Sequence, residues 1–230
     1  MTRRPDRIPL LPLSDLVHFP RTRLGLDVVD PRHRDLVAEL AARDEDDRWL
    51  GTVLVKPGAR RDARGRRRIF PGGTAGRVVD LERRPDGRSR LALVGETRFS
   101  VTRELGERRF REAEVELLGE PDLREDDAGV VAVRREIVER VARLRAEDAL
   151  GEDLALDAGE LLALGLGTSF EELVNRVAAG VPLPALRKLA LLVRSLPERA
   201  LELLAILRGR ERVVELLRPY RRPAGDPDLN

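Results

Sequence analysis

The side chains best suited to binding chemistry in this 230-residue sequence are arginines that crowd one short segment between two apolar runs. Arginine is always charged and offers a planar set of donors that matches carboxylates and phosphates, so the segment could be a cationic arm for an acidic protein, peptide or nucleic acid. The simpler interpretation is a solvated hairpin tip, which Gly58 and Gly65 favour. Aromatic residues make up 3% of the chain, which argues against stacking on single-stranded nucleic acid. The candidate binding residues are Arg60, Arg61, Arg64, Arg66, Arg67 and Arg68.

The residues that could catalyse a reaction do not form a known catalytic pattern. The serines lack a Gly-x-Ser-x-Gly context, and cysteine is absent. Neither lysine, Lys56 or Lys188, stands in the Gly-Lys-Ser/Thr setting of a phosphate-binding loop. We therefore expect no enzymatic activity, no catalytic residue and no cofactor.

The two histidines, His18 and His33, could bind a metal only with carboxylates such as Asp15 or Asp30 close by. His18 lies in a strand-like run, and His33 falls in the first turn of a predicted helix. Structural or surface roles explain both residues, so we expect no metal site.

The composition is that of a soluble globular protein with a heavily charged surface. Hydrophobic residues are 42% and charged residues 37% of the chain, and the formal net charge is only +2. Such a small net charge gives little reason to expect nucleic acid as the partner. The lack of cysteine fits a reducing compartment, and no apolar run approaches the roughly 20 residues of a membrane-spanning helix. We expect a cytoplasmic protein with no signal peptide and no membrane partner.

The chain changes character near residue 125, from a strand-rich to a helical pattern. In the first part, Pro9, Pro12 and Pro20 place the opening segment at a sheet edge or in an irregular strand. Asp30 is the predicted cap of a helix that runs to about residue 43 and buries three apolar side chains. Further strands are predicted at 24–29, 49–56, 73–81, 90–101 and 111–118, with Arg84-Pro85-Asp86-Gly87 as a turn.

The second part predicts a bundle of helices. An apolar stripe indicates a helix over about 127–147, and Ser169-Phe-Glu-Glu172 and Ser195-Leu-Pro-Glu198 are capping-box patterns. Helices are expected at 152–163 with Asp157 near the cap, at 169–179, at 184–194 and at 196–218.

Two blocks of the sequence resemble a known family, the N-terminal domain of Lon proteases. The stretch from Ile8 to Val37 has that family's order of strand, Phe-Pro turn, strand and helix entrance. The stretch from Gly72 to Val101 resembles its Gly-Thr strand, Pro-Asp-Gly turn and Gly-x-x-Arg-Phe strand, and residues 173–192 resemble its helix–loop–helix more loosely. The matching residues of the second block are Gly73, Thr74, Gly87, Gly95, Arg98 and Phe99, whereas Leu11, Arg21, Asp27 and His33 depart from the pattern. Most departures should keep the fold, but Arg21 replaces a glycine and is expected to alter the turn after Phe19-Pro20.

The resemblance implies an α+β fold, in which a β-barrel (pseudo-barrel) like that of pseudouridine synthase and archaeosine transglycosylase (PUA-like) precedes an α-helical bundle. The expected organisation is a flexible N-terminus (1–7), a barrel domain (8–122), a helical bundle (123–220) and a disordered tail (221–230). No ATPase or peptidase domain is evident, so a stand-alone member is expected.

The function that the resemblance implies is a non-catalytic module that binds proteins or peptides. Its partners would be unfolded, tagged or other client proteins, and it could act as an adaptor for a protease in trans. This predicts a contiguous exposed apolar patch, which cannot be assigned to residues from the sequence. RNA binding is the alternative, since relatives of the PUA-like barrel bind RNA, and an uncharacterised hydrolase is the third possibility.

Overall fold

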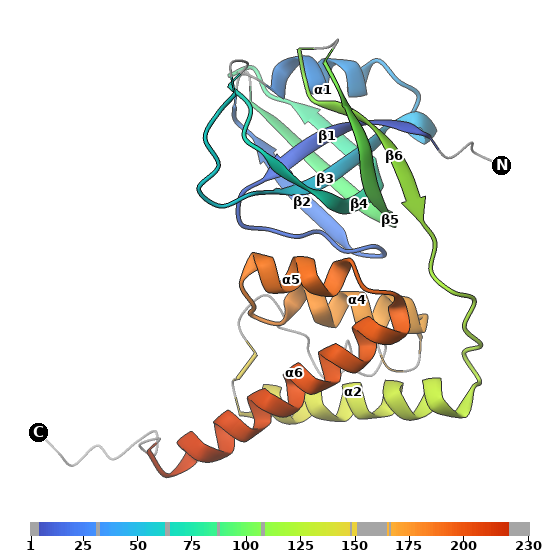
Figure 1. Ribbon diagram of the computed structural model, residues 1–230, viewed down its shortest axis with the longest axis vertical. Coiled ribbons are helices and arrows are strands. Elements are labelled where there is room, and N and C mark those ends of the chain that lie inside the picture. The colour runs from blue at the N-terminus through green and yellow to red at the C-terminus, as the bar shows by residue number, and fades with distance from the viewer. Residues whose placement is uncertain are drawn as a thin grey trace, which may run out of the picture.

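The protein is described by a computed structural model over residues 5–30, 33–62, 65–86, 88–106, 109–147, 149–150, 165 and 167–220. A β-rich lobe is followed by a lobe of helices, and the chain passes from one to the other after its last strand (Figure 1). The predicted α+β fold is confirmed. Residues 1–4, the tail 221–230 and the predicted helix at 152–163 with Asp157 lie outside the described residues.

The β-rich lobe is one six-stranded sheet that curls into a ring. Its order is β2-β5-β4-β3-β1-β6, and a further pairing of β5 with β6 closes the ring, with β2 attached to β5 beside it. The lobe is therefore barrel-like without being a regular barrel. The strands are β1 (Arg7–Leu13), β2 (Arg23–Val28), β3 (Trp49–Val55), β4 (Ile69–Arg83), β5 (Ser89–Leu105) and β6 (Glu112–Leu118).

Of the two alternatives predicted for the first strand, a sheet edge or an irregular strand, the edge position is wrong, because β1 lies between β3 and β6. It pairs with β6 through residues 7–9 and with β3 through residues 10–13. Each half of the strand thus has a register partner on one side, which accommodates the missing N–H groups of Pro9 and Pro12 inside a ring.

The bend predicted at Gly95 is present in β5. The register with β4 shifts there, since Ala75 faces Thr97 while Gly76 faces Gly95. A Cβ atom on Gly95 would lie 2.5 Å from the backbone oxygen of Phe19, so only glycine allows the loop after β1 to approach this closely. Gly87, the predicted turn residue, lies outside the described residues.

Two apolar clusters hold the β-rich lobe together, one inside the ring and one beneath α1 (Arg34–Ala41). Leu36, Val37 and Leu40 of α1 are buried, as predicted. The helix begins later than predicted, because His33 and not Asp30 is its N-cap residue. A short 3₁₀ helix, η2 (Glu45–Asp47), leads from α1 to β3.

The helical lobe consists of α2 (Ala128–Ala146), α4 (Phe170–Gly180), α5 (Ala185–Leu192), α6 (Leu196–Leu217) and the 3₁₀ turn η4 (Arg218–Tyr220). The predicted caps at Ser169 and Ser195 are present. The Ser169 hydroxyl accepts a hydrogen bond from the N–H of Glu172 at 3.1 Å, and the N–H of Ser195 donates to the Glu198 carboxylate at 3.1 Å. β6 ends and α2 begins on either side of residue 122, and the domain limits 8–122 and 123–220 remain our proposal.

The two lobes share one apolar core. Val17, Phe19 and Leu54 of the β-rich lobe belong to the same buried cluster as the inner faces of the helices. α4 and α5 lie against the end of the ring, while α2 and α6 lie farther from it (Figure 1). The helical lobe is thus packed against the sheet, and the contact between the lobes is not limited to the segment of chain that connects them.

Candidate binding surfaces

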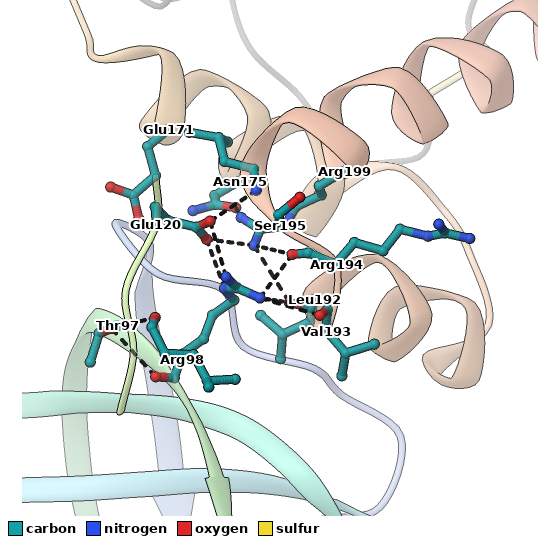
Figure 2. Close-up of polar contacts among 12 residues, drawn as sticks. Thr97, Arg98, Glu120, Glu171, Asn175, Leu192, Val193, Arg194, Ser195 and Arg199 are labelled. Atoms are coloured by element: carbon teal, nitrogen blue, oxygen red, sulfur yellow. Dashed lines mark hydrogen bonds and ion pairs between the residues drawn. The ribbon is translucent and has the colours of Figure 1, made fainter. Parts of the chain in front are cut away.

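A buried polar network fixes the junction between the lobes (Figure 2). Its centre is the carboxylate of Glu120, which follows β6. Oε1 of Glu120 lies 2.7 Å from Nε of Arg98 on β5 and 2.7 Å from Nη2 of Arg199 on α6. Oε2 accepts a hydrogen bond from the N–H of Leu196 at 2.8 Å, at the start of α6. One carboxylate therefore joins the sheet to the last helix.

The same two arginines bind the C-terminal end of α5. Arg98 donates to the backbone oxygen of Arg194 at 2.8 Å, and Arg199 donates to that oxygen at 2.9 Å and to Oδ1 of Asn175 at 2.5 Å. Helix C-termini carry partial negative charge, so they suit cations. The Arg199 side chain is 0% exposed, and its burial lowers the pKa of the guanidinium. The network is structural, and it explains the position of Arg98, which the sequence indicated only as part of a pattern.

A cleft of about 650 Å³ opens between the lobes. The loop between β1 and β2 contributes His18 and Arg21, and α4 contributes Arg176. Arg21 has φ of +61°, the left-handed conformation that favours glycine. Its N–H donates to the oxygen of Gly95 at 2.9 Å, and its Nε lies 3.2 Å from Glu171 of α4. A strained residue thus connects the two walls of the cleft.

His18 has the structural role predicted for it. It is 4% exposed, and its Nε2 lies 3.0 Å from the backbone oxygen of Thr22. Burial lowers the pKa of the imidazole, so His18 is neutral near pH 7. In the described part of the chain, no three histidine or acidic side chains come together in a way that could hold a metal ion.

The outer side of α5 and α6 carries a groove of about 530 Å³ that is mainly apolar. Leu183 contributes from the segment before α5, and α6 contributes Ala205, Ile206 and Val213. Val213 is 54% exposed. The exposed apolar residues Leu216 and Leu217 follow it at spacings of three and four and so extend the same helix face, and the exposed Tyr220 lies just beyond in η4.

The opposite face of α6 is charged where it meets α2. Arg208 of α6 donates to Glu136 of α2 at 2.7 Å, and Glu211 of α6 forms an ion pair with Arg140 of α2. Surface helices usually turn their apolar stripe inward and their charges outward. The C-terminal half of α6 partly reverses this arrangement, and it leaves an apolar strip uncovered in the described structure.

The predicted arginine segment forms a hairpin before β4, with Arg61 bridged to Arg67. Arg61, Arg66 and Arg67 border a cavity of about 320 Å³, whereas Arg60 and Arg68 are not among its described lining residues. Arg64 lies outside the described residues. Arg109 and Arg111, from the turn before β6, complete the cavity wall. No pattern in the sequence indicates these two residues, because they lie more than 40 positions from the hairpin and only the closed ring brings them together.

Comparison with known proteins shows which family shares this architecture. The sequence model of one protein family, the ATP-dependent protease La (LON) substrate-binding domain, matches residues 7–209. The chain belongs to this family. It is 28% identical over 178 residues to a Lon protease of Desulfatibacillum aliphaticivorans, a match that covers 73% of this chain and 21% of that protein. The chain therefore spans about a fifth of the length of that relative.

Two solved structures share the fold of this Lon substrate-binding family member. The N-terminal domain of Mycobacterium avium complex Lon protease is 16% identical, with a TM-score of 0.65 over 88% of this chain and 98% of that one. The Lon N-terminal domain protein from Xanthomonas campestris is 24% identical, with a TM-score of 0.55 over 86% of this chain and 97% of that one. In the described part of the chain, no helix combines the length and the apolar character needed to cross a membrane.

Proposed function

We propose that this chain binds exposed apolar segments of unfolded or tagged proteins in the groove formed by α5 and α6, without chemistry of its own. The observation that carries the proposal is the uncovered apolar face of α6, in a chain whose family is described as substrate-binding. Apolar faces left open to solvent on a soluble protein are characteristic of interaction sites.

The charges beside the groove favour segments that also carry acidic residues. Arg187 and Arg210 line it, and within the described chain neither has a carboxylate partner. Among the described lining residues Glu202 is the one acidic residue, and it lies 3.8 Å from Arg194. Burying apolar surface contributes about 25 cal/mol per Å² before the costs of association, so a few buried side chains support micromolar binding. The cationic rim would raise the association rate and select acidic segments.

The test removes the apolar face without changing charge. Val213→Gln with Leu217→Gln should weaken binding of a reduced, carboxymethylated and permanently unfolded protein at least tenfold, measured by calorimetry. Val131→Gln is the matched control, because Val131 is 48% exposed on α2 and does not line the groove. Equal binding by the wild-type chain and the double variant would contradict the proposal.

We further propose an adaptor role, in which the chain works in the cytoplasm and delivers bound clients to a protease supplied in trans. Family membership supports this role. The expected result is faster degradation of an unfolded reporter by a purified Lon protease when the chain is added, with loss of the effect in the groove variant. An unchanged degradation rate would remove the adaptor role and leave client binding intact.

A further inference from the structure

The cavity at the arginine hairpin, about 320 Å³ in volume, is built from parts of the chain that are far apart in sequence. Arg61, Arg66 and Arg67 come from the hairpin before β4, and Arg109 and Arg111 come from the turn before β6. The volume falls within the roughly 300–1,000 Å³ that small ligand sites occupy. Five arginines thus converge on one concave surface, which a solvated hairpin tip does not require.

The carboxylates near the cavity are mostly engaged already. Asp62 accepts from the backbone N–H of Arg66 at 2.8 Å, Glu104 lies 3.3 Å from Arg111, and Asp35 lies 3.9 Å from Arg109. Asp30 is the one acidic residue among the described residues that line the cavity. In the described chain, Arg61 and Arg67 have no carboxylate partner. Their guanidinium groups therefore have capacity for an added anion.

Arg111 forms the buried wall of the cavity. Its side chain is 6% exposed, and its Nη2 donates to the backbone oxygen of Arg67 at 2.7 Å. Nη1 is buried and lies 3.3 Å from Oε2 of Glu104, in an ion pair that lacks hydrogen-bond geometry. Burial lowers the pKa of this guanidinium. A buried cation thus holds the hairpin in place and adds positive charge to the cavity wall, opposed by one carboxylate that is 38% exposed.

The rest of the wall is mixed. Leu10, Val55 and Phe110 are apolar, whereas Ser14, Asp30 and His33 are polar or charged. Phe110 is only 7% exposed and cannot offer a face to a nucleobase without rearrangement. The wall suits a ligand in which an anion adjoins an apolar group. A carboxylate matches the planar fork of arginine, and a peptide supplies an apolar side chain beside it.

We propose that this cavity binds a peptide carboxylate, either a C-terminal carboxylate or an acidic side chain, next to an apolar residue. The inference rests on the proposed function, because it takes the ligand to be a client peptide. It adds a second anchor, on the β-rich lobe, to the apolar groove on the helical lobe.

The test uses three short fluorescein-labelled peptides with the same apolar sequence. One ends in a free carboxylate, one ends in an amide, and one ends in an amide but carries an internal glutamate between leucines. Fluorescence anisotropy at low salt should show about tenfold tighter binding of at least one carboxylate peptide than of the plain amide. The two carboxylate peptides distinguish the two sources.

The variants separate the cavity from general charge attraction. Arg61→Gln with Arg67→Gln should abolish the carboxylate preference, whereas Arg60→Gln with Arg68→Gln removes equal charge from the same hairpin and should retain it. Because Arg61 also donates to the oxygen of Gly65 at 2.7 Å, Arg109→Gln gives a second test. Its side chain is 90% exposed and comes from the other segment, so its loss leaves the hairpin contacts in place while weakening the preference severalfold.

Three results would overturn the cavity proposal: no carboxylate preference in the wild-type chain, the same loss in both hairpin variants, or retention of the full preference in Arg61→Gln with Arg67→Gln. A further result would assign the site to nucleic acid and so also overturn the proposal. Structured RNA would displace the peptide, and Arg61→Gln with Arg67→Gln would reduce the affinity for RNA more than the affinity for the peptide. The proposed function fails separately, if the groove variant binds unfolded protein as the wild-type chain does.

Discussion

Arg21 offers a direct measurement of backbone strain at the junction of the lobes. Its φ of +61° is unfavourable for a residue with a Cβ atom by about 1–2 kcal/mol, and glycine does not bear this cost. Glycine loses about 0.4–1 kcal/mol through the greater freedom of the unfolded chain. We therefore expect Arg21→Gly to be more stable than Arg21→Ala by about 1 kcal/mol.

The side chain of Arg21 contributes a smaller, separate amount. Its ion pair with Glu171 joins a 53% exposed arginine to an 18% exposed glutamate, so we expect at most about 1 kcal/mol from it. Arg21→Ala should lose the ion pair and keep the backbone strain. Arg21→Gly loses the ion pair but is also relieved of the strain, so its free energy of unfolding should be close to that of the wild-type chain. Because added salt screens the ion pair, it should reduce the difference in unfolding free energy between the wild-type chain and Arg21→Ala.

The assay is urea unfolding at pH 7, followed by circular dichroism, with the free energies compared at equal m-values. Gly25 provides the control, because a Cβ atom there meets nothing within 4 Å and its φ is not in the left-handed region. Gly25→Ala should leave stability unchanged or raise it. At position 21 the order is the opposite, because glycine should be more stable than alanine there. If Arg21→Ala equals or exceeds Arg21→Gly in stability, the argument from strain is wrong.

Three further predictions concern buried groups. Glu120→Gln should destabilise the chain by about 3 kcal/mol in the same urea assay, because it leaves two buried arginines without a counter-charge. The control is Glu116→Gln, which should change stability little because Glu116 is exposed. Equal effects of the two substitutions would contradict the structural role of the network. The pKa of His18 is lowered from 6.5 by burial, so the unfolded chain binds the extra proton first and stability should fall as pH drops below about 6.5, by up to about 1.4 kcal/mol per pH unit. His18→Asn should flatten this slope between pH 7.5 and 5.5, and an unchanged slope would exclude His18 as its source. Gly73→Ala should lower the thermal midpoint by several degrees, because the new Cβ would lie 2.3 Å from the backbone oxygen of Thr52, and a midpoint within one degree of the wild-type value would refute this.

The sequence predicted the elements well where local chemistry decides them. Ser169 and Ser195 cap helices because their hydroxyl or backbone groups reach partners within one turn. The burial of Leu36, Val37 and Leu40 follows from their spacing on one face of α1. The start of α1 was missed because Asp30 is the stronger N-cap by residue type, whereas the structure has the N-cap at His33, whose N–H donates to the backbone oxygen of Asp30 at 2.9 Å.

The candidate surfaces were less accessible to sequence analysis. The cationic hairpin was visible as a run of arginines, but its partners Arg109 and Arg111 were not, since nothing local connects residues so far apart. The groove was also hidden, because Val213 and Leu217 have the spacing of an ordinary buried stripe. Only the docking of α6 on α2 shows that their side of the helix is left uncovered.

The sequence alone determined the family, the order of the described strands and helices and the caps of α4 and α6, because each depends on residue types at short and regular spacing. Tertiary structure decided how the ring closes through β5 and β6, where β1 lies in it, which arginines gather at one cavity and which face of α6 stays open. These features depend on contacts between segments distant in the chain, and their energies come from packing and burial that no local pattern records.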